Sequence, residues 1–185
     1  ILREGLSEHD QDWADILEVL RLTHSQLSKA EFQQETTAFF QSQKHPDLNR
    51  SYRSTWYQPM RELIDYLSAR QFRVFIVSGG GINFMRTVGS DLYGLSPERI
   101  IGSYGSNSVQ TIDGVPRIFH ESAFDLFLEG EEKILAIERH IGGHPIIAVG
   151  NVGSGSDVKM LQYSQQNTTA SLQLMILHDD PVREF

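Results

Sequence analysis

Apolar residues are grouped along the chain in two ways, as short unbroken runs and at helical spacing. The clearest run extends from Phe72 to Gly81, where aromatic and β-branched residues end abruptly in Ser78 and three glycines. An unbroken apolar run that stops at small residues is typical of a buried parallel strand. A second run, PIIAV at 145–149, leads into another segment rich in glycine and serine at 150–157. Because open α/β folds keep their ligand sites at the carboxyl ends of parallel strands, we expect both segments to line one sheet edge.

Helical spacing of apolar residues predicts the elements around these two runs. The predicted helices cover 13–22, 29–40 with Ser28 as N-cap, 59–67 with Pro59 at the start, 82–93, 133–141 and 158–163. The further predicted strands cover 100–101, 109–112, 115–119 and 172–177, and the middle two form a β-hairpin around Asp113-Gly114. The pattern therefore predicts an α/β fold with a parallel sheet, in which a helical segment over 1–58 precedes a core over 59–185.

The composition and charge of the chain argue against some classes of binding partner. The 185 residues carry 16 Lys and Arg against 24 Asp and Glu, a formal net charge of -8. An acidic chain without a run of Lys or Arg is a poor candidate for binding nucleic acid through its phosphates. The absence of Cys excludes disulfides and thiol catalysis, and it leaves cytoplasm and periplasm equally open. No apolar run approaches the length of a membrane span, so we expect no membrane partner; the oligomeric state is not indicated.

Ser78, Gly79, Gly80 and Gly81 suit an anion, most obviously phosphate. They offer a hydroxyl and closely approachable backbone amides ahead of a predicted helix N-terminus. A tight turn that requires glycine for its backbone angles is an equally good interpretation. Ser78 is a weak candidate for a nucleophile, because Ile76 stands where the nucleophile elbow of a serine hydrolase has glycine.

Asn151 and Asp157 flank the second glycine-rich segment and could hold a hard cation such as Mg²⁺ through an amide oxygen and a carboxylate. The alternative is that Asp157 is an ordinary helix N-cap. Lys133 opens the helix that precedes this segment, where it could neutralise a phosphate or simply be solvated. None of these three residues has a unique interpretation alone.

Together, these segments resemble the haloacid dehalogenase superfamily, specifically its phosphoserine phosphatase-like branch. FIVSGGG is similar to the second motif, whose serine or threonine hydrogen-bonds the transferring phosphoryl group; the match falls on Ser78. Lys133 is similar in placement to the third-motif lysine. GNVGSGSDVKML is similar to the fourth motif, in which acidic residues hold Mg²⁺, and the matching positions are Asn151 and Asp157. The resemblance covers most of the chain, from about Thr23 onward.

The resemblance implies a Rossmann-like parallel core with a helical cap formed by 1–58. It implies a Mg²⁺-dependent phosphatase that hydrolyses a small phosphomonoester through an aspartyl-phosphate intermediate. In that assignment Ser78 and Lys133 are catalytic. The phosphate-binding residues are Ser78, Gly79, Gly80 and Lys133, and the metal ligands are Asn151 and Asp157.

Two features depart from the family pattern. The fourth motif usually opens with Gly-Asp, whereas this chain has Gly150-Asn151. The first motif, an apolar strand ending in the nucleophilic Asp-x-Asp, is absent; Asp10-Gln11-Asp12 has the spacing but follows no buried strand. We therefore expect the nucleophile upstream of Ile1, the 185 residues alone to be inactive, and the neighbours of the missing strand to have open edges. The alternative is a non-catalytic α/β module that binds phosphate or a nucleotide.

Overall fold

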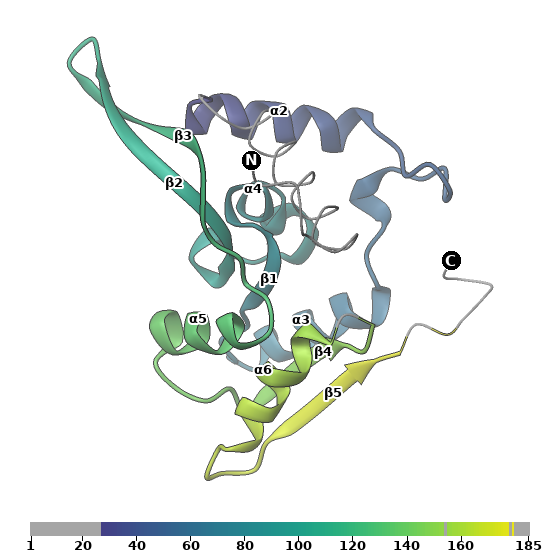
Figure 1. The fold of residues 1–185 in the computed structure, drawn as a ribbon. Helices are drawn as coiled ribbons and strands as arrows, with labels where there is room; N and C mark the ends of the chain where they lie inside the picture. Colours follow the sequence, from purple (N-terminus) through teal and green to yellow (C-terminus); the bar gives the residue numbers. More distant parts are fainter. Residues whose placement is uncertain (1–26, 154, 178, 180–185) are drawn as a thin grey trace, which may run out of the picture. The chain divides into compact units, whose positions relative to one another are not determined.

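The structure is a computed structural model that describes residues 27–153, 155–177 and 179 (Figure 1). The described residues fall into two compact units. Unit 1 holds the described parts of 1–61 together with 104–126, and unit 2 holds 62–103 together with the described parts of 127–185. The helix predicted at 13–22 lies outside the described residues, as do Asp10 and Asp12. The domain division after residue 58 stays a prediction.

Unit 1 pairs a capped helix with a β-hairpin. Helix α2 (Lys29–Ser42) begins with the predicted N-cap: the Glu31 N–H donates to Ser28 Oγ at 3.2 Å, and the Ser28 N–H donates to the Glu31 carboxylate at 2.8 Å. This reciprocal capping box satisfies two N–H groups that the helix itself leaves without partners. The buried Phe32 side chain packs edge-on against the ring of His120 in the hairpin, with ring centroids 5.2 Å apart. A short 3₁₀ helix, η1 (Tyr52–Ser54), follows α2.

The hairpin strands are longer than predicted. Strand β2 (Ile100–Ile112) is continuous, and β3 (Val115–Leu126) pairs with it from Tyr104 onward. The prediction of separate strands at 100–101 and 109–112 was wrong because the polar residues between them find ladder partners in β3, a signal that apolar patterning does not carry. The predicted Asp113-Gly114 turn is confirmed by positive φ angles of 52° and 78°, as a type I′ turn requires.

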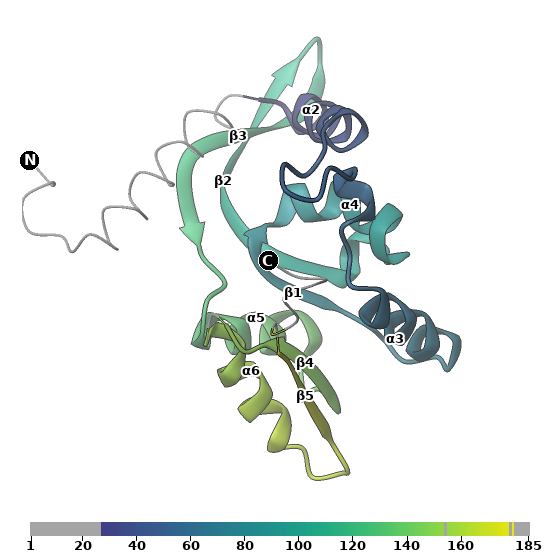
Figure 2. The same cartoon turned by 90° about the vertical axis from the view of Figure 1, so that its right-hand side faces the viewer.

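Unit 2 contains two strand-helix units with parallel strand pairing, which confirms the predicted α/β class. Strand β1 (Ile76–Gly81) runs parallel to the start of β2 and leads directly into α4 (Ile82–Tyr93). Strand β4 (Ile147–Asn151) runs parallel to β5 (Leu172–Ile176), and α6 (Ser156–Gln165) packs on both. Figure 2 shows α5 (Glu131–Ile141) next to α6. The remaining elements are α3 (Gln58–Ala69), which begins in unit 1, and the 3₁₀ helix η2 (Pro97–Arg99).

The core of unit 2 is aliphatic and gathers where these elements meet. Its buried apolar side chains are Val88, Leu92, Leu95, Ile100, Ile101, Leu128, Ala136, Ile137, Ala148, Met160 and Leu161. Among the described residues, no helix combines the length and the apolar character that crossing a membrane requires.

Strand β1 begins four residues later than the apolar run predicts. Gln71 adopts a φ of 66° and the Phe72 N–H donates to Leu67 O at 3.1 Å, so the first residue of the run is bonded to the last turn of α3. Ladder pairing starts only at Ile76, opposite Ile100. The run is half-buried or exposed, because β1 pairs on one edge only within the described residues.

The strands do not form one continuous sheet. In the described part of the chain, one sheet has the order β1-β2-β3 and a separate sheet has the order β4-β5. We expected the two glycine-rich segments to follow strands of one sheet. The strands that precede them, β1 and β4, instead lie in separate sheets of the described residues. In the described residues, β1 and β4 each have one edge without a strand partner.

Candidate functional site

The first glycine-rich segment forms a bulge at the end of β1. Ser78 pairs with Gly102 and the next pairing joins Gly81 to Ser103, so Gly79 and Gly80 stand outside the ladder. We call these two residues the glycine bulge. The Gly80 N–H donates to Ser78 Oγ at 3.0 Å. These residues belong to the end of β1, which extends to Gly81.

Helix α4 begins immediately after this bulge. Gly81 is its N-cap and provides no side-chain hydrogen bond to the first turn. A helix N-terminus carries N–H groups without intrahelical partners and a partial positive charge, both of which favour an anion. The Ser78 hydroxyl and the bulge therefore lie beside such an N-terminus, and their role in binding phosphate stays a prediction.

Glycine at position 102 allows β2 to lie directly against the bulge. A Cβ built on Gly102 would lie 2.8 Å from the carbonyl oxygen of Gly80 and 2.9 Å from Cα of Ile82. Both distances are to backbone atoms, which cannot swing aside as a flexible side chain can. The close approach therefore requires glycine and helps to fix the path of the chain from β1 into α4.

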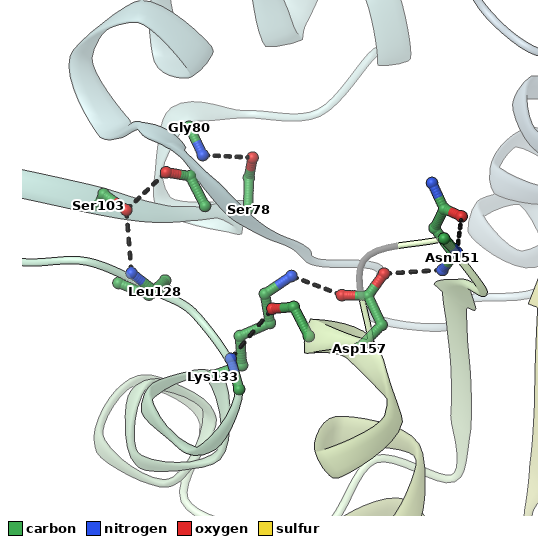
Figure 3. Close-up of polar contacts among 11 residues, drawn as sticks. Ser78, Gly80, Ser103, Leu128, Lys133, Asn151 and Asp157 are labelled. Atoms are coloured by element: carbon green, nitrogen blue, oxygen red, sulfur yellow. Dashed lines mark hydrogen bonds and ion pairs between the residues drawn. The ribbon is translucent and has the colours of Figure 1, made fainter. Parts of the chain in front are cut away.

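Lys133 and Asp157 form a buried ion pair in the second part of the site (Figure 3). Lys133 Nζ donates to Asp157 Oδ1 at 2.5 Å, and the two side chains are only 8% and 14% exposed. The other carboxylate oxygen, Oδ2, accepts the backbone N–H of Asn151 at 2.7 Å. Three elements thus converge on one carboxylate: α5, α6 and the carboxyl end of β4.

The two alternative interpretations of these residues were wrong. The N-cap of α6 is Gly155, with a φ of 65° and no side-chain cap, and Asp157 bonds across to β4 and α5. Lys133 is buried and paired, so it is not a solvated surface lysine. The Asp157 carboxylate lies in the first turn of α6, where the helix dipole favours a negative charge.

Two buried serines that the sequence did not single out connect these groups. Ser103 Oγ donates to the Gly79 carbonyl at 2.6 Å and accepts the Leu128 N–H at 2.9 Å. Ser156 Oγ accepts the Gly130 N–H at 3.0 Å. A serine within a strand, such as Ser103, or at a helix start, such as Ser156, carries no sequence signal for such a role, because its partners are backbone groups brought close by the tertiary fold.

The predicted site residues thus form two clusters within unit 2. Ser78, Gly79 and Gly80 lie at the end of β1, and Lys133, Asp157 and Asn151 lie where α5, α6 and β4 meet (Figure 3). Among the described residues, no hydrogen bond joins Ser78 directly to Lys133 or Asp157. The connection runs through the backbone segment that Ser103 and Ser156 hold.

The predicted magnesium ligands are already engaged. Both oxygens of Asp157 accept a hydrogen bond, and Asn151 Oδ1 accepts the Gly153 N–H at 2.7 Å. The described residues contain no group of three or more His, Asp or Glu side chains placed to hold a metal ion. Asp157 and Asn151 retain lone pairs and could contribute two oxygens, but Mg²⁺ requires near-octahedral coordination. The described residues would therefore supply two ligands of such a site, and water or further residues would supply the rest.

Comparison with known proteins finds solved structures with a similar fold. The chain matches no protein-family model and no curated protein sequence. It is similar to the crystal structure of a conserved functionally unknown protein from Anaerococcus prevotii DSM 20548, with a TM-score of 0.57 and 18% identity over 84% of this chain and 45% of that chain. This chain therefore spans less than half the length of that protein.

A second solved structure is a phosphoserine phosphohydrolase-like protein from Francisella tularensis subsp. tularensis SCHU S4. The TM-score is 0.44 and the identity is 16%, over 86% of this chain and 71% of that chain. At identities this low, the similarity to solved structures concerns the fold alone. The function must be argued from the chemistry of the site.

Proposed function

We propose that unit 2 carries the phosphate-binding and charge-balancing groups of a phosphomonoester hydrolase of the haloacid dehalogenase type. The observation that carries the proposal is the buried Lys133–Asp157 pair, fixed to the carboxyl end of β4 by the Asn151 N–H. Placing a lysine out of contact with water is costly unless a partner and hydrogen bonds compensate for the lost hydration. Such an arrangement is more readily explained by a site that handles negative charge than by stability alone.

The groups present suit the transfer of a phosphoryl group. Ser78 Oγ and the N–H groups at the start of α4 would bind the non-bridging phosphate oxygens, as donors fixed in place before the reaction begins. Lys133 would offset the negative charge of the phosphate and of an attacking carboxylate. In the proposed reaction that carboxylate displaces the alcohol from phosphorus, and water then hydrolyses the aspartyl-phosphate to release phosphate and regenerate the carboxylate.

The nucleophile is the part of the proposal that no described residue supplies. We propose that it is an aspartate upstream of Ile1, on a parallel strand that pairs with β1, with β4 or with both. The open edges of β1 and β4 in the described residues support this placement. Mg²⁺ stays a proposal as well; it would need ligands in addition to Asp157 and Asn151, and no step is assigned to it.

Hydrolysis of para-nitrophenyl phosphate tests this function. The 185-residue protein and the product of the complete gene should be compared with and without Mg²⁺, with Asp157→Asn as the inactive control. We expect activity only in the complete protein, and its loss both with EDTA and in the variant. Activity in the 185-residue protein would mean that the nucleophile has been assigned wrongly.

A module that binds phosphate or a nucleotide without turnover is the second candidate. It is favoured by Asn151, a neutral amide at the position where the family's fourth motif has a carboxylate. In that case the complete protein would be stabilised by phosphate ligands but would release no product. The same assay, combined with thermal unfolding in the presence of inorganic phosphate, separates the two.

A further inference from the structure

The Ser103 side chain is hydrogen-bonded to two backbone groups, one in each of the two segments that lead to the clusters of the site. Ser103 is the last residue of β2 that belongs to unit 2, and it is only 2% exposed. Its hydroxyl donates to the carbonyl of Gly79 and accepts the N–H of Leu128 (Figure 3). A serine hydroxyl has one hydrogen to donate, and here that hydrogen is committed to the glycine bulge.

The two partners of Ser103 lead to the two halves of the site. Gly79 lies between Ser78 and Gly80, and the Gly80 N–H donates to the Ser78 hydroxyl that is proposed to bind phosphate. Leu128 lies in the segment before α5, the helix that carries Lys133. That segment is held a second time at Gly130 by Ser156, the neighbour of Asp157. Side-chain hydroxyls thus hold the segment that lies between the bulge and the ion pair, whereas no strand pairing joins β1 to β4 in the described residues.

We infer that Ser103 is a positioning residue that orients the glycine bulge relative to Lys133, an inference that rests on the proposed function. Ser103 itself would not touch the phosphate. Without the hydroxyl, the Gly79 carbonyl would lose the donor that holds the peptide between Gly79 and Gly80. The N–H of that peptide donates to Ser78 Oγ and so orients the hydroxyl that is proposed to bind phosphate. On this inference, the Ser103 hydroxyl affects phosphate affinity beyond its contribution to folding.

The test compares two buried serines in unit 2. Ser103→Ala removes the hydroxyl and both of its hydrogen bonds. Ser164→Ala is the matched control, because Ser164 is also fully buried and its hydroxyl also donates to a backbone carbonyl, that of Pro145 at 2.8 Å, but it lies in α6 away from the bulge. Inorganic phosphate is titrated into each protein by calorimetry, and the urea unfolding midpoint is measured in parallel.

We expect Ser103→Ala to weaken phosphate binding about fivefold, the effect of one lost hydrogen bond, and Ser164→Ala to leave it unchanged at a similar loss of stability. Ser103→Cys, which keeps the size of the side chain but donates weakly, should fall between wild type and Ser103→Ala and provides a second variant if alanine prevents folding. Equal phosphate affinity in wild type and both Ser103 variants would overturn the inference and leave the proposed function standing. The absence of saturable phosphate binding in wild type would instead overturn the proposed function.

Discussion

Lys133 and Asp157 are the two side chains in unit 2 on which the proposed function depends. Each side chain carries a formal charge and is largely shielded from water. The attraction between the two charges offsets part of the cost of burying them. A buried pair contributes little net stability compared with apolar residues, but removing one partner leaves an uncompensated charge. The pair is therefore expected to behave as a unit in mutagenesis.

Replacing Lys133 by Met should lower the free energy of unfolding by about 3–5 kcal/mol, because the Asp157 carboxylate would remain buried without its partner. Adding Asp157→Asn to the same protein should restore most of that loss. Urea unfolding of the two single variants and the double variant measures the coupling.

Lys159→Met is the matched control for this change, because Lys159 belongs to an exposed ion pair. Its side chain is 51% exposed, and its Nζ lies 3.6 Å from Glu131 Oε1. Its cost should be below about 1 kcal/mol, as for exposed ion pairs generally. Equal losses for Lys133→Met and Lys159→Met would contradict the buried pair.

Individual site residues were predictable only where a motif carried them. The order of Ser78, Lys133 and Asp157 in the sequence indicated their positions, and the structure brings Lys133 and Asp157 into contact. Ser103 and Ser156 were missed because their partners are the backbone groups of Gly79, Leu128 and Gly130, which come close only after folding.

The helices of this protein were easier to predict than its strands. Helix α4 has the predicted bounds, and α5 ends at the predicted Ile141, with Gly142 as its C-cap at a φ of 76°. Both depend on signals within a few residues of the chain. The bounds of β1 and β2 depend on which distant residues pair, so β1 begins late at Ile76 and β2 continues through the polar residues that precede Val109.

Gly102→Ala tests whether the close approach of β2 to the glycine bulge matters. The added methyl would lie within 3.0 Å of backbone atoms of Gly80 and Ile82, so β1 and α4 must shift. We expect a loss of about 1–3 kcal/mol in stability, typical of overpacking, together with weaker binding of inorganic phosphate. Gly143→Ala is the control, because nothing lies within 4 Å of its Cβ position. An unchanged phosphate affinity in Gly102→Ala would show that the bulge tolerates displacement.

The capping box of α2 gives a pH dependence that is independent of the proposed function. The hydrogen bond with the Ser28 side chain is the largest cause, and the one with the Ser28 backbone the next, that holds the pKa of the Glu31 carboxyl below its ordinary value of 4.5. A lowered folded-state pKa contributes stability that is present above the unfolded pKa and is lost as the pH falls through the folded value. The urea midpoint should thus fall less steeply below pH 4.5 in Glu31→Gln than in wild type. Parallel pH profiles would contradict the capping contribution.

The division of the strands into two sheets is the main feature of the fold as a whole that the sequence did not predict directly. Apolar patterning identifies strands but not their order, and β1 and β4 are not paired within the described residues. An open strand edge presents unpaired N–H and C=O groups that favour association.

We expect the 185-residue protein to self-associate more than the product of the complete gene, if an upstream strand covers these edges. Sedimentation velocity at several concentrations measures this difference. Identical sedimentation of both proteins as monomers would argue against a missing strand beside β1 or β4.

The most direct test of the site is a titration of inorganic phosphate against variants that remove charges in pairs. Lys133→Met with Asp157→Asn eliminates the buried pair without leaving a lone charge, whereas Lys159→Met with Glu131→Gln eliminates an exposed pair of the same composition. The proposed function predicts saturable binding in wild type, a loss of roughly tenfold or more in affinity for the first double variant, and wild-type affinity for the second. Equal affinities in all three proteins would contradict a phosphate site at Lys133.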